Sequence, residues 1–321
     1  MNILVTGGCG FIGHNVVQTL EQLTHTVAVI DNKTTYGIIP QAEINHLLSQ
    51  RTKKIAGPVY NISIESAELV NYVVEKHAPD VVVHLASFPR QKVVNSDPAW
   101  GSRTMMEGLF NLLESAKKHQ VQRFVYISSS MVYGNFDNDV VESAVCNPEG
   151  QYGIMKLAGE WLVKDYARRT GMEAVIIRPS AVYGPLDVED RVVAKFMLTA
   201  MRGGELSVNG PDEKLDFTYV TDLSAGIVQA ALSDKASGNT YNLTRSQSVT
   251  LLEAAETIVN IVGSGTIRVK NRDLNFPSRG SLNITAARRD LNFNPTVNVA
   301  DGFERYYESL SNSVHWSPTT V

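Results

Sequence analysis

Residues 1–31 decide the fold: MNILVTGGCGFIGHNVVQTLEQLTHTVAVID. An apolar run at residues 3–5 leads directly into the glycine-rich loop Gly7-Gly8-Cys9-Gly10-Phe11-Ile12-Gly13, and an amphipathic segment follows. Glycines at this spacing permit a tight turn and let an anion approach the free backbone N–H groups at the start of a helix. A glycine-rich turn without a ligand is the alternative, but the position between a predicted strand and a predicted helix favours a dinucleotide site.

Asp31 ends the next apolar run, eighteen residues beyond Gly13. An acidic side chain at this place can accept hydrogen bonds from both hydroxyls of an adenosine ribose, and it repels the extra phosphate of NADP. The alternative is an Asp that caps a helix or belongs to a loop. Together with the glycine loop, Asp31 favours NAD as the cofactor.

The first half of the chain alternates short apolar runs with longer amphipathic stretches. Continuous apolar runs are typical of strands buried on both faces of a parallel sheet. The predicted strands are residues 3–5, 27–30, 81–85, 124–128 and 175–177, and the predicted helices are residues 12–23, 66–77, 98–119 and 151–170. The pattern therefore predicts an α/β fold, a Rossmann-type doubly wound parallel sheet.

After Tyr183 this alternation becomes irregular, and Gly-Pro and Gly-Gly pairs divide the chain into shorter segments. We expect a smaller α/β substrate-binding lobe at residues 181–311, after an NAD-binding domain at residues 1–180. Parts of residues 210–245 should return to the first domain. The polar end, residues 312–321, is expected to be disordered.

Composition narrows the class of protein. The chain has 321 residues, 43% of them hydrophobic, and a net charge of -4, so a nucleic-acid surface is not predicted. No run of eighteen apolar residues is present, which argues against a membrane span. Cys9 and Cys146 have no zinc-like spacing with other ligands, so no metal site is predicted. Without a recognisable secretory signal, a cytoplasmic location is expected.

The pattern Tyr152-Gly153-Ile154-Met155-Lys156 lies on a predicted helix. A spacing of four residues puts the phenol and the ammonium on one helical face. Positive charge from Lys156 and from a nicotinamide should lower the pKa of Tyr152, so that it can act as a general base near neutral pH. The pair follows a serine-rich strand end, residues 128–130, and a Rossmann start, and this order makes it specific.

These motifs together resemble the extended short-chain dehydrogenase/reductase family, in particular its NAD-dependent nucleotide-sugar epimerase/dehydratase group, which includes UDP-glucose/UDP-galactose 4-epimerase. The similarity runs from Met1 to about residue 310. Besides the motifs above it includes residues 83–86 (VHLA), 178–185 (RPSAVYGP) and 216–222 (DFTYVTD). The resemblance implies an enzyme with bound NAD and a homodimer in which residues 98–119 and 151–170 of both subunits form a four-helix bundle.

The resemblance also implies roles for single residues. Around NAD it places a pyrophosphate loop, two ribose contacts, an adenine flank, and residues nearer the nicotinamide. The pyrophosphate loop is Gly7, Gly10, Phe11, Ile12 and Gly13. The ribose contacts are Asp31 and Asn32, and the adenine flank is Asn61 and Ile62. The residues nearer the nicotinamide are Leu85, Ala86, Ser128, Tyr152, Lys156, Pro179 and Val182. The catalytic residues it implies are Ser129, Tyr152 and Lys156.

Residues 130 and 131 separate the activities within the group. Sugar 4,6-dehydratases carry an Asp-Glu pair here, because loss of a hydroxyl needs an acid and a base. This chain has Ser130 and Met131. Dehydration is therefore not expected, and oxidation, reduction or epimerisation is preferred.

The chain also departs from the family where a diphosphate would bind. Ala181 stands at the position of a family Asn, and Leu215 at that of a family Arg; Met105 replaces another frequent Asn. Cationic side chains could substitute for the lost partners. The predicted substrate contacts are Ser87, Ser130, Met131, Ala181, Arg191, Lys195, Lys214 and Arg279.

His84 and Arg90 are two further candidate site residues. His84 lies near the end of a buried strand, which favours a structural imidazole over a catalyst. Arg90 follows the same strand, and both a substrate contact and a surface charge stay open for it.

The leading hypothesis is an NAD-dependent epimerase of a nucleotide-activated sugar, acting at carbon 4 through a transient 4-keto intermediate. The alternative uses the same site as a dehydrogenase or reductase of a sugar, a sugar acid or a 4-keto nucleotide sugar, with net redox turnover. A non-catalytic NAD-sensing protein is a third possibility, against which the intact set of Ser129, Tyr152 and Lys156 argues.

Overall fold

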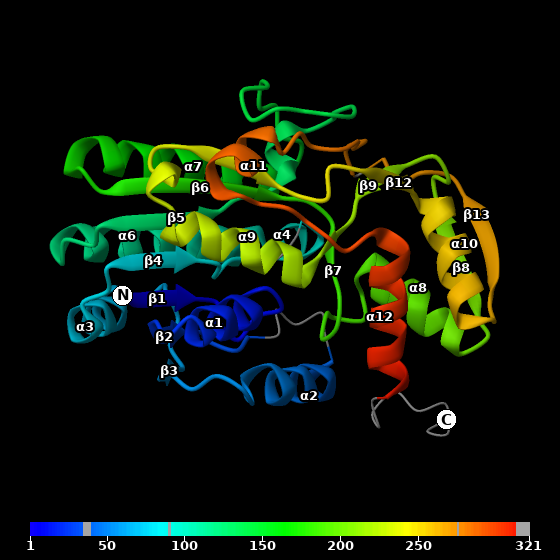
Figure 1. The fold of residues 1–321 in the computed structure, drawn as a ribbon, viewed down its shortest axis with the longest axis horizontal. Coiled ribbons are helices and arrows are strands. Elements are labelled where there is room, and N and C mark those ends of the chain that lie inside the picture. The colour runs from blue at the N-terminus through cyan, green and yellow to red at the C-terminus, as the bar shows by residue number, and fades with distance from the viewer. Residues whose placement is uncertain (35–39, 89–90, 275, 313–321) are drawn as a thin grey trace.

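A seven-stranded parallel sheet forms the centre of the molecule (Figure 1). The computed structural model describes residues 1–34, 40–88, 91–274 and 276–312. Across the sheet the order is β11-β6-β5-β4-β1-β2-β3, so the chain starts in the middle and winds outward in both directions. The strands are β1 (Asn2–Thr6), β2 (Thr26–Ile30), β3 (Val59–Tyr60), β4 (Val81–His84), β5 (Arg123–Ile127), β6 (Glu173–Pro179) and β11 (Thr240–Leu243).

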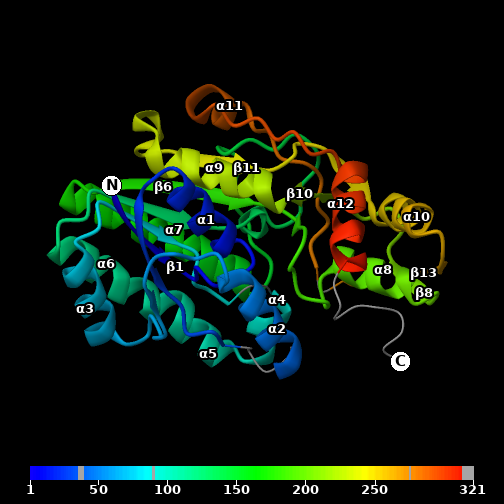
Figure 2. The ribbon, with the colours of Figure 1, turned by 60° about the horizontal axis from the view of Figure 1, so that its bottom comes forward.

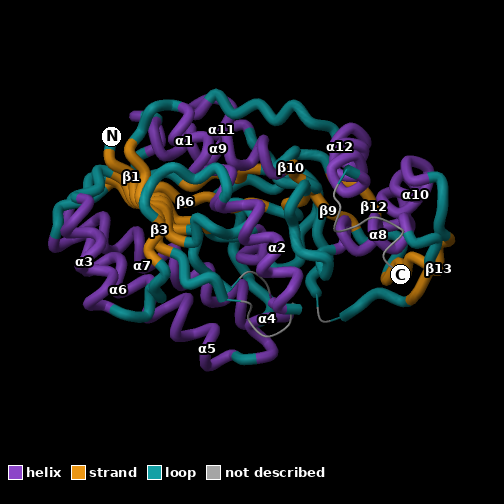
Figure 3. Tube along the Cα trace, turned by 90° about the horizontal axis from the view of Figure 1, so that it is seen from below, coloured by secondary structure: helices purple, strands orange, loops and turns teal. Residues whose placement is uncertain are grey.

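Helices cover both faces of this sheet (Figures 2 and 3). α1 (Gly13–Gln22), α9 (Val220–Leu232) and α11 (Thr285–Leu291) pack on one face, and α3 (Ala67–His77), α6 (Gly108–Lys118) and α7 (Gln151–Thr170) on the other. Alternate residues of β1 therefore enter different cores: Ile3 and Val5 one, Leu4 the other. Burial on both faces explains why the strands are continuous apolar runs, and the predicted doubly wound α/β fold is confirmed.

The helical run predicted at residues 98–119 is interrupted in its middle. It consists of α5 (Pro98–Ser102), a π-helical turn η1 (Arg103–Glu107) and α6. A π turn inserts one residue and rotates the side chains that follow. Thr104 is buried there and donates to a Glu65 oxygen at 2.5 Å.

Several elements escaped prediction. α2 (Gln41–Thr52) has a weakly periodic, mostly polar sequence, and α4 (Gln91–Ser96) and β3 are very short. β11 was not predicted as a strand, although parts of residues 210–245 were expected to return to the first domain; it pairs with β6 at the sheet edge, about sixty residues away in the chain. Its placement depends on long-range packing, which local periodicity does not encode.

A second lobe lies beyond the carboxyl ends of the strands (Figure 1). It has its own core and contains α8 (Val192–Met201), α10 (Leu251–Val262), α12 (Val299–Ser311), β8 (Glu205–Asn209), β9 (Lys214–Asp216), β12 (Ser248–Thr250) and β13 (Thr266–Lys270). The short pair β7 (Val182–Tyr183) and β10 (Thr218–Tyr219) and the 3-10 turns η2 (Ser130–Tyr133) and η3 (Asp234–Ala236) complete the described elements.

The domain boundaries stay predictions, and residues 313–321 of the expected disordered end lie outside the described residues. Within the described ranges, no helix combines the length and the apolar character that crossing a bilayer needs.

Gly159 sets how closely α7 approaches the sheet. A Cβ at this position would lie 2.2 Å from the hydroxyl oxygen of Tyr126, a ring that is buried in the core. We expect Gly159→Ala to lower the free energy of unfolding by about 1–3 kcal/mol, because neither the helix nor the ring can give way without strain. Urea denaturation measures this, with Lys164→Ala on the exposed side of α7 as the control. Equal stability of the two variants would contradict the packing described.

Candidate active site

The glycine loop turns tightly between β1 and α1. Gly7 has φ +70°, and its N–H donates to the Ile30 carbonyl at 2.7 Å. A Cβ on Gly7 would lie 2.7 Å from the Ala86 nitrogen, and one on Gly13 only 2.1 Å from the Gly7 carbonyl oxygen. Side chains at these two positions would therefore block the turn, and their absence leaves backbone N–H groups open at the start of α1.

Asp31, just after the end of β2, is hydrogen-bonded to this loop. Its carboxylate accepts from the Cys9 N–H at 2.9 Å and from the Lys33 N–H at 2.7 Å. Burial raises the pKa of Asp31, and these two backbone hydrogen bonds oppose the shift. A carboxylate can accept about four hydrogen bonds, so Asp31 keeps capacity for ribose hydroxyls.

A cavity of about 730 Å³ runs from the glycine loop to the second lobe. The predicted cofactor and substrate residues line it with one exception. Asn61 is exposed and lies outside the lining, whereas its neighbour Ile62 belongs to it. Residues from chain positions 7 to 279 are thus brought to one crevice at the carboxyl ends of the strands, where open α/β sheets bind ligands.

Ser129, Tyr152 and Lys156 meet on one wall of this cavity. The Ser129 oxygen accepts from the Met131 N–H at 3.2 Å. The Ser129 side chain is also near enough to Tyr152 to act on the pKa of its phenol. Lys156 lies one turn further along α7, and its ammonium donates to the Ile127 carbonyl at 2.7 Å. Its nitrogen is 5.9 Å from the centre of the Tyr152 ring.

The pKa values of Tyr152 and Lys156 on this wall differ from the prediction. Burial raises the pKa of Tyr152, while Arg191 and the Ser129 hydrogen bond oppose the shift. The predicted lowering of the Tyr152 pKa is therefore wrong for the protein's own groups. Burial also lowers the pKa of Lys156 to about 7, with Glu160 opposing, so its charge is only partly present at neutral pH.

Behind the catalytic wall lies a buried polar network. The Ser128 hydroxyl donates to Glu160 at 2.5 Å, and Glu160 forms a two-point ion pair with Arg178, at 2.6 and 2.9 Å. Arg178 also donates to the Tyr133 hydroxyl, which in turn donates to Asn242 on β11. The Ser128 side chain is thus committed to Glu160.

Arg191 and Arg279 are two guanidinium groups in the cavity lining that could bind an anion. Burial lowers the pKa of Arg279 to about 10, with Glu213 opposing the shift and Arg191 adding to it. Its Nε atom, like that of Arg191, is buried and has no hydrogen-bond partner among the described residues. Arg191 lies 3.9 Å from Asp187. Lys195 and Lys214 are exposed at the rim.

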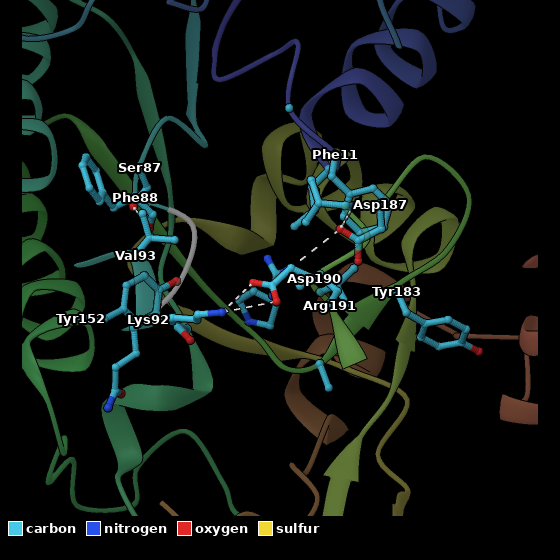
Figure 4. A pocket seen from close by; sticks show the side chains of 18 of the residues that line it. Phe11, Ser87, Phe88, Lys92, Val93, Tyr152, Tyr183, Asp187, Asp190 and Arg191 are labelled. Atoms are coloured by element: carbon cyan, nitrogen blue, oxygen red, sulfur yellow. Dashed lines mark hydrogen bonds and ion pairs between the residues drawn. The ribbon is translucent and has the colours of Figure 1, made fainter. Parts of the chain in front are cut away.

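Figure 4 shows how the walls face each other: Tyr152 and Phe88 on one side, Asp187 and Arg191 on the other. An ion pair between Lys92 and Asp190, at 3.2 Å, links the two sides. Because α4 carries Lys92 and the loop before α8 carries Asp190, the pair joins the sheet domain to the second lobe.

Positions 130 and 131, where an Asp-Glu pair would be expected in a dehydratase, carry side chains without an acid group. Ser130 donates to the Ser180 hydroxyl at 3.1 Å. Met131 packs with Phe88 and Tyr152 in a small apolar cluster. Ser87 donates to the Phe88 carbonyl at 3.1 Å, and Ala181 adopts φ +36°.

His84 lies away from the cavity. Its Nδ1 is 2.7 Å from the Thr6 hydroxyl, and burial lowers its pKa to about 3, so the ring is neutral. This geometry supports a structural imidazole. Arg90 lies outside the described residues.

Sequence reasoning missed Arg51 on α2. The side chain is buried, lines the cavity, and donates from Nε and Nη2 to the Leu186 carbonyl at 3.1 and 2.6 Å. No local motif marks it, since its partner lies 135 residues away. Among the described residues, no group of three or more His, Cys, Asp or Glu side chains is arranged to hold a metal ion.

Comparison with known proteins gives the family. The profile of the NAD dependent epimerase/dehydratase family matches residues 3–244. The chain belongs to this family. It is 30% identical to a dTDP-glucose 4,6-dehydratase of Streptomyces niveus over 334 residues, 99% of this chain and 95% of that protein. It is 28% identical to an uncharacterized UDP-glucose epimerase of Bacillus subtilis (strain 168), covering 97% of this chain and 98% of that protein.

A solved structure resembles the whole chain. It is the UDP-glucuronic acid 4-epimerase from Bacillus cereus in complex with UDP-glucuronic acid and NAD, with a TM-score of 0.89 and 27% identity. The similarity covers 96% of this chain and 98% of that one. The predicted family and enzyme class are thereby confirmed.

NAD, the cofactor of this family, fits the crevice. The two glycines at which a Cβ would collide leave room for a pyrophosphate, and Asp31 offers carboxylate oxygens at the end of β2. Gly7, Gly13 and Asp31 would hold the dinucleotide; Lys156 lies where the nicotinamide end would bind.

Lys156 should lower the stability of the fold. The unfolded chain keeps this proton up to the ordinary lysine pKa of 10.5, whereas the folded chain releases it near pH 7. Stability therefore rises with pH between these values. At pH 6 we expect Lys156→Met to raise the free energy of unfolding by about a few kcal/mol, so that the variant unfolds at a higher temperature than the parent. This gain in stability should shrink as the pH approaches 10.

Thermal unfolding at several pH values, without added nucleotide, measures this difference. Lys164→Met, an exposed site on the same helix, is the control and should change little at any pH. A gain in stability of Lys156→Met that does not depend on pH would contradict the electrostatic explanation.

Proposed function

We propose that this family member is an NAD-dependent epimerase of a nucleotide-activated sugar, acting at carbon 4 through a transient 4-keto intermediate. One observation carries the proposal: Tyr152 and Ser129 lie together on the cavity wall, while positions 130 and 131, beside them, carry no acid. The site can thus move a hydroxyl proton but lacks the pair that eliminates water.

The protein's residues would work as follows. The Tyr152 phenolate oxygen takes the proton of the hydroxyl at carbon 4 and becomes the phenol, and Ser129 hydrogen-bonds the same substrate oxygen. Bound NAD supplies the acceptor of the hydride, and its positive ring also favours the phenolate. Tyr152 returns the proton when the sugar is reduced again, so the site neither gains nor loses a proton over one cycle.

Epimerisation also requires the keto sugar to present its other face. The wall formed by Phe88, Val93 and Met131 is apolar and offers no directional hydrogen bonds that would fix one orientation. A weakly held sugar can turn, provided the rest of the substrate is anchored elsewhere. Arg279 and Arg191 would provide this anchor by binding a diphosphate.

Net oxidation or reduction is the second candidate. Ala181 and Leu215 stand where family members carry Asn and Arg, and their loss fits a substrate without a diphosphate. In that case the same Tyr152 and Ser129 would act once per turnover, and NADH would accumulate or be consumed.

The two candidates differ in one measurable property. The purified protein with NAD is incubated with UDP-, GDP-, dTDP- and CDP-sugars, and NMR follows the stereochemistry at carbon 4 while absorbance follows NADH. We expect one epimer pair without net NADH. Net NADH would favour the dehydrogenase, and no turnover across the panel would count against the epimerase.

Tyr152→Phe tests the proton transfer in the same assay. Removal of the phenol oxygen should lower the turnover rate by about 10²–10⁴-fold, with NAD binding retained. Tyr72→Phe, at an exposed tyrosine of α3 outside the cavity lining, is the matched control. Full activity of the Tyr152 variant would exclude this residue as the base.

A homodimer through a four-helix bundle is also proposed. α6 and α7 leave large apolar side chains in solvent: Phe110 is 41% exposed, Ile154 53% and Trp161 66%. Such side chains on two adjacent helices are typical of a protein interface.

Trp161→Glu places a charge in the middle of this face and should convert the dimer to a monomer in light scattering. Val269→Glu, on β13 of the second lobe and 52% exposed, should leave the mass unchanged. A parent protein that is already monomeric would contradict the dimer.

A further inference from the structure

Glu160 is a fully buried carboxylate to which the mechanism above gives no task. It lies one helical turn after Lys156 on α7, so both side chains project from the same face of the helix. It also accepts the hydroxyl of Ser128, the neighbour of the proposed catalytic Ser129. The carboxylate therefore borders the reacting groups without lining the cavity itself.

Stability alone does not account for the Glu160–Arg178 pair. Both side chains are almost inaccessible, 1% and 4%, and lie 2.6 Å apart. Removing two charges from water costs so much that an apolar pair of similar volume is commonly as stable or more stable. An ion pair in this place is better explained by what its carboxylate does to nearby groups.

Lys156 is the group most affected. Its nitrogen is 5.2 Å from the centre of the Tyr126 ring on β5 and 5.9 Å from that of the Tyr152 ring on α7. It also interacts electrostatically with His84 on β4 and with Glu160, one turn further along α7. His84 is uncharged because burial lowers its pKa to about 3, and burial raises the pKa of Tyr126 far above neutrality. Among the described groups facing Lys156, Glu160 thus supplies the negative charge.

Arg178 fixes where that charge lies. Two guanidinium nitrogens hold the two carboxylate oxygens, while a third donates to the Tyr133 hydroxyl and to the Glu142 carbonyl, at 2.9 and 3.0 Å. The carboxylate cannot swing away from α7 without breaking these bonds.

We infer that Glu160 is a positioning residue of the proposed reaction: held by Arg178, it orients the Ser128 hydroxyl and keeps Lys156 charged beside Tyr152. The inference rests on the proposed function for its meaning, but the charge state of Lys156 can be measured without any sugar. Loss of Glu160 lowers the pKa of Lys156 further, and the ammonium is then missing at neutral pH.

Competitive acetylation with peptide mass spectrometry measures that charge state, because only the neutral amine reacts. The reaction of Lys156 is followed against pH in the full-length protein, with the exposed Lys117 and Lys164 as internal references. In Glu160→Gln we expect the pKa of Lys156 to fall by about one unit or more.

Two further variants keep the test decisive. Glu160→Gln leaves Arg178 buried and unpaired and can unfold the chain. The double variant Glu160→Gln/Arg178→Met removes both charges and should show the same fall. Glu173→Gln breaks another Arg–Glu pair, formed with Arg123 at the amino-terminal ends of β5 and β6, and should leave the pKa of Lys156 unchanged.

An unchanged Lys156 titration in a folded Glu160 variant would overturn the inference and leave Glu160 a structural residue. Failure of the sugar panel would not affect this result. If a sugar turns over, the variant should also lose activity at a lower pH than the parent, since activity falls as pH rises through the pKa of Lys156.

Discussion

The hydrogen bond from the Lys156 ammonium to the Ile127 carbonyl, 2.7 Å long, joins helix α7 to the end of strand β5. The rest of the site depends on this close approach. Gly153 and Gly159 make it possible, because a Cβ would lie 2.6 Å from the Met131 carbonyl oxygen at the first and 2.2 Å from the Tyr126 hydroxyl at the second. With α7 this near the sheet, Tyr152 reaches the Ser129 side chain.

The same close packing makes the chemistry harder. Burial raises the pKa of Tyr152 and lowers that of Lys156, so both groups tend toward their neutral forms. A different charged residue opposes each of these pKa shifts: Glu160 favours the ammonium of Lys156, and Arg191 favours the phenolate of Tyr152. Glu160 belongs to α7 itself, whereas Arg191 comes from the second lobe, so the acidity of the phenol depends on how the two lobes meet.

Local sequence patterns predicted the sheet and which residues line the cavity beside Tyr152. Strands buried on both faces are continuous apolar runs, a glycine loop needs its glycines for steric reasons, and Tyr152 and Lys156 are joined by helical periodicity. What escaped prediction depends on contacts between distant segments: Arg51 with Leu186, β11 with β6, and Glu160 with Arg178. The effect of burial on the pKa of Tyr152 also escaped prediction, because a sequence shows which charges are near but not how deeply a phenol is buried.

Arg191 connects substrate binding to the acidity of Tyr152. Its guanidinium lowers the pKa of the phenol, and it would also contact the diphosphate of a nucleotide sugar. Because an anion bound at Arg191 cancels part of its field at Tyr152, the phenolate would then depend more on Lys156 and on the Ser129 hydrogen bond. Lys156 is itself only partly charged at neutral pH, so the carboxylate behind it becomes most important when substrate is bound. A buried Glu160 that costs desolvation energy in the empty site is therefore consistent with selection for charge in the occupied one.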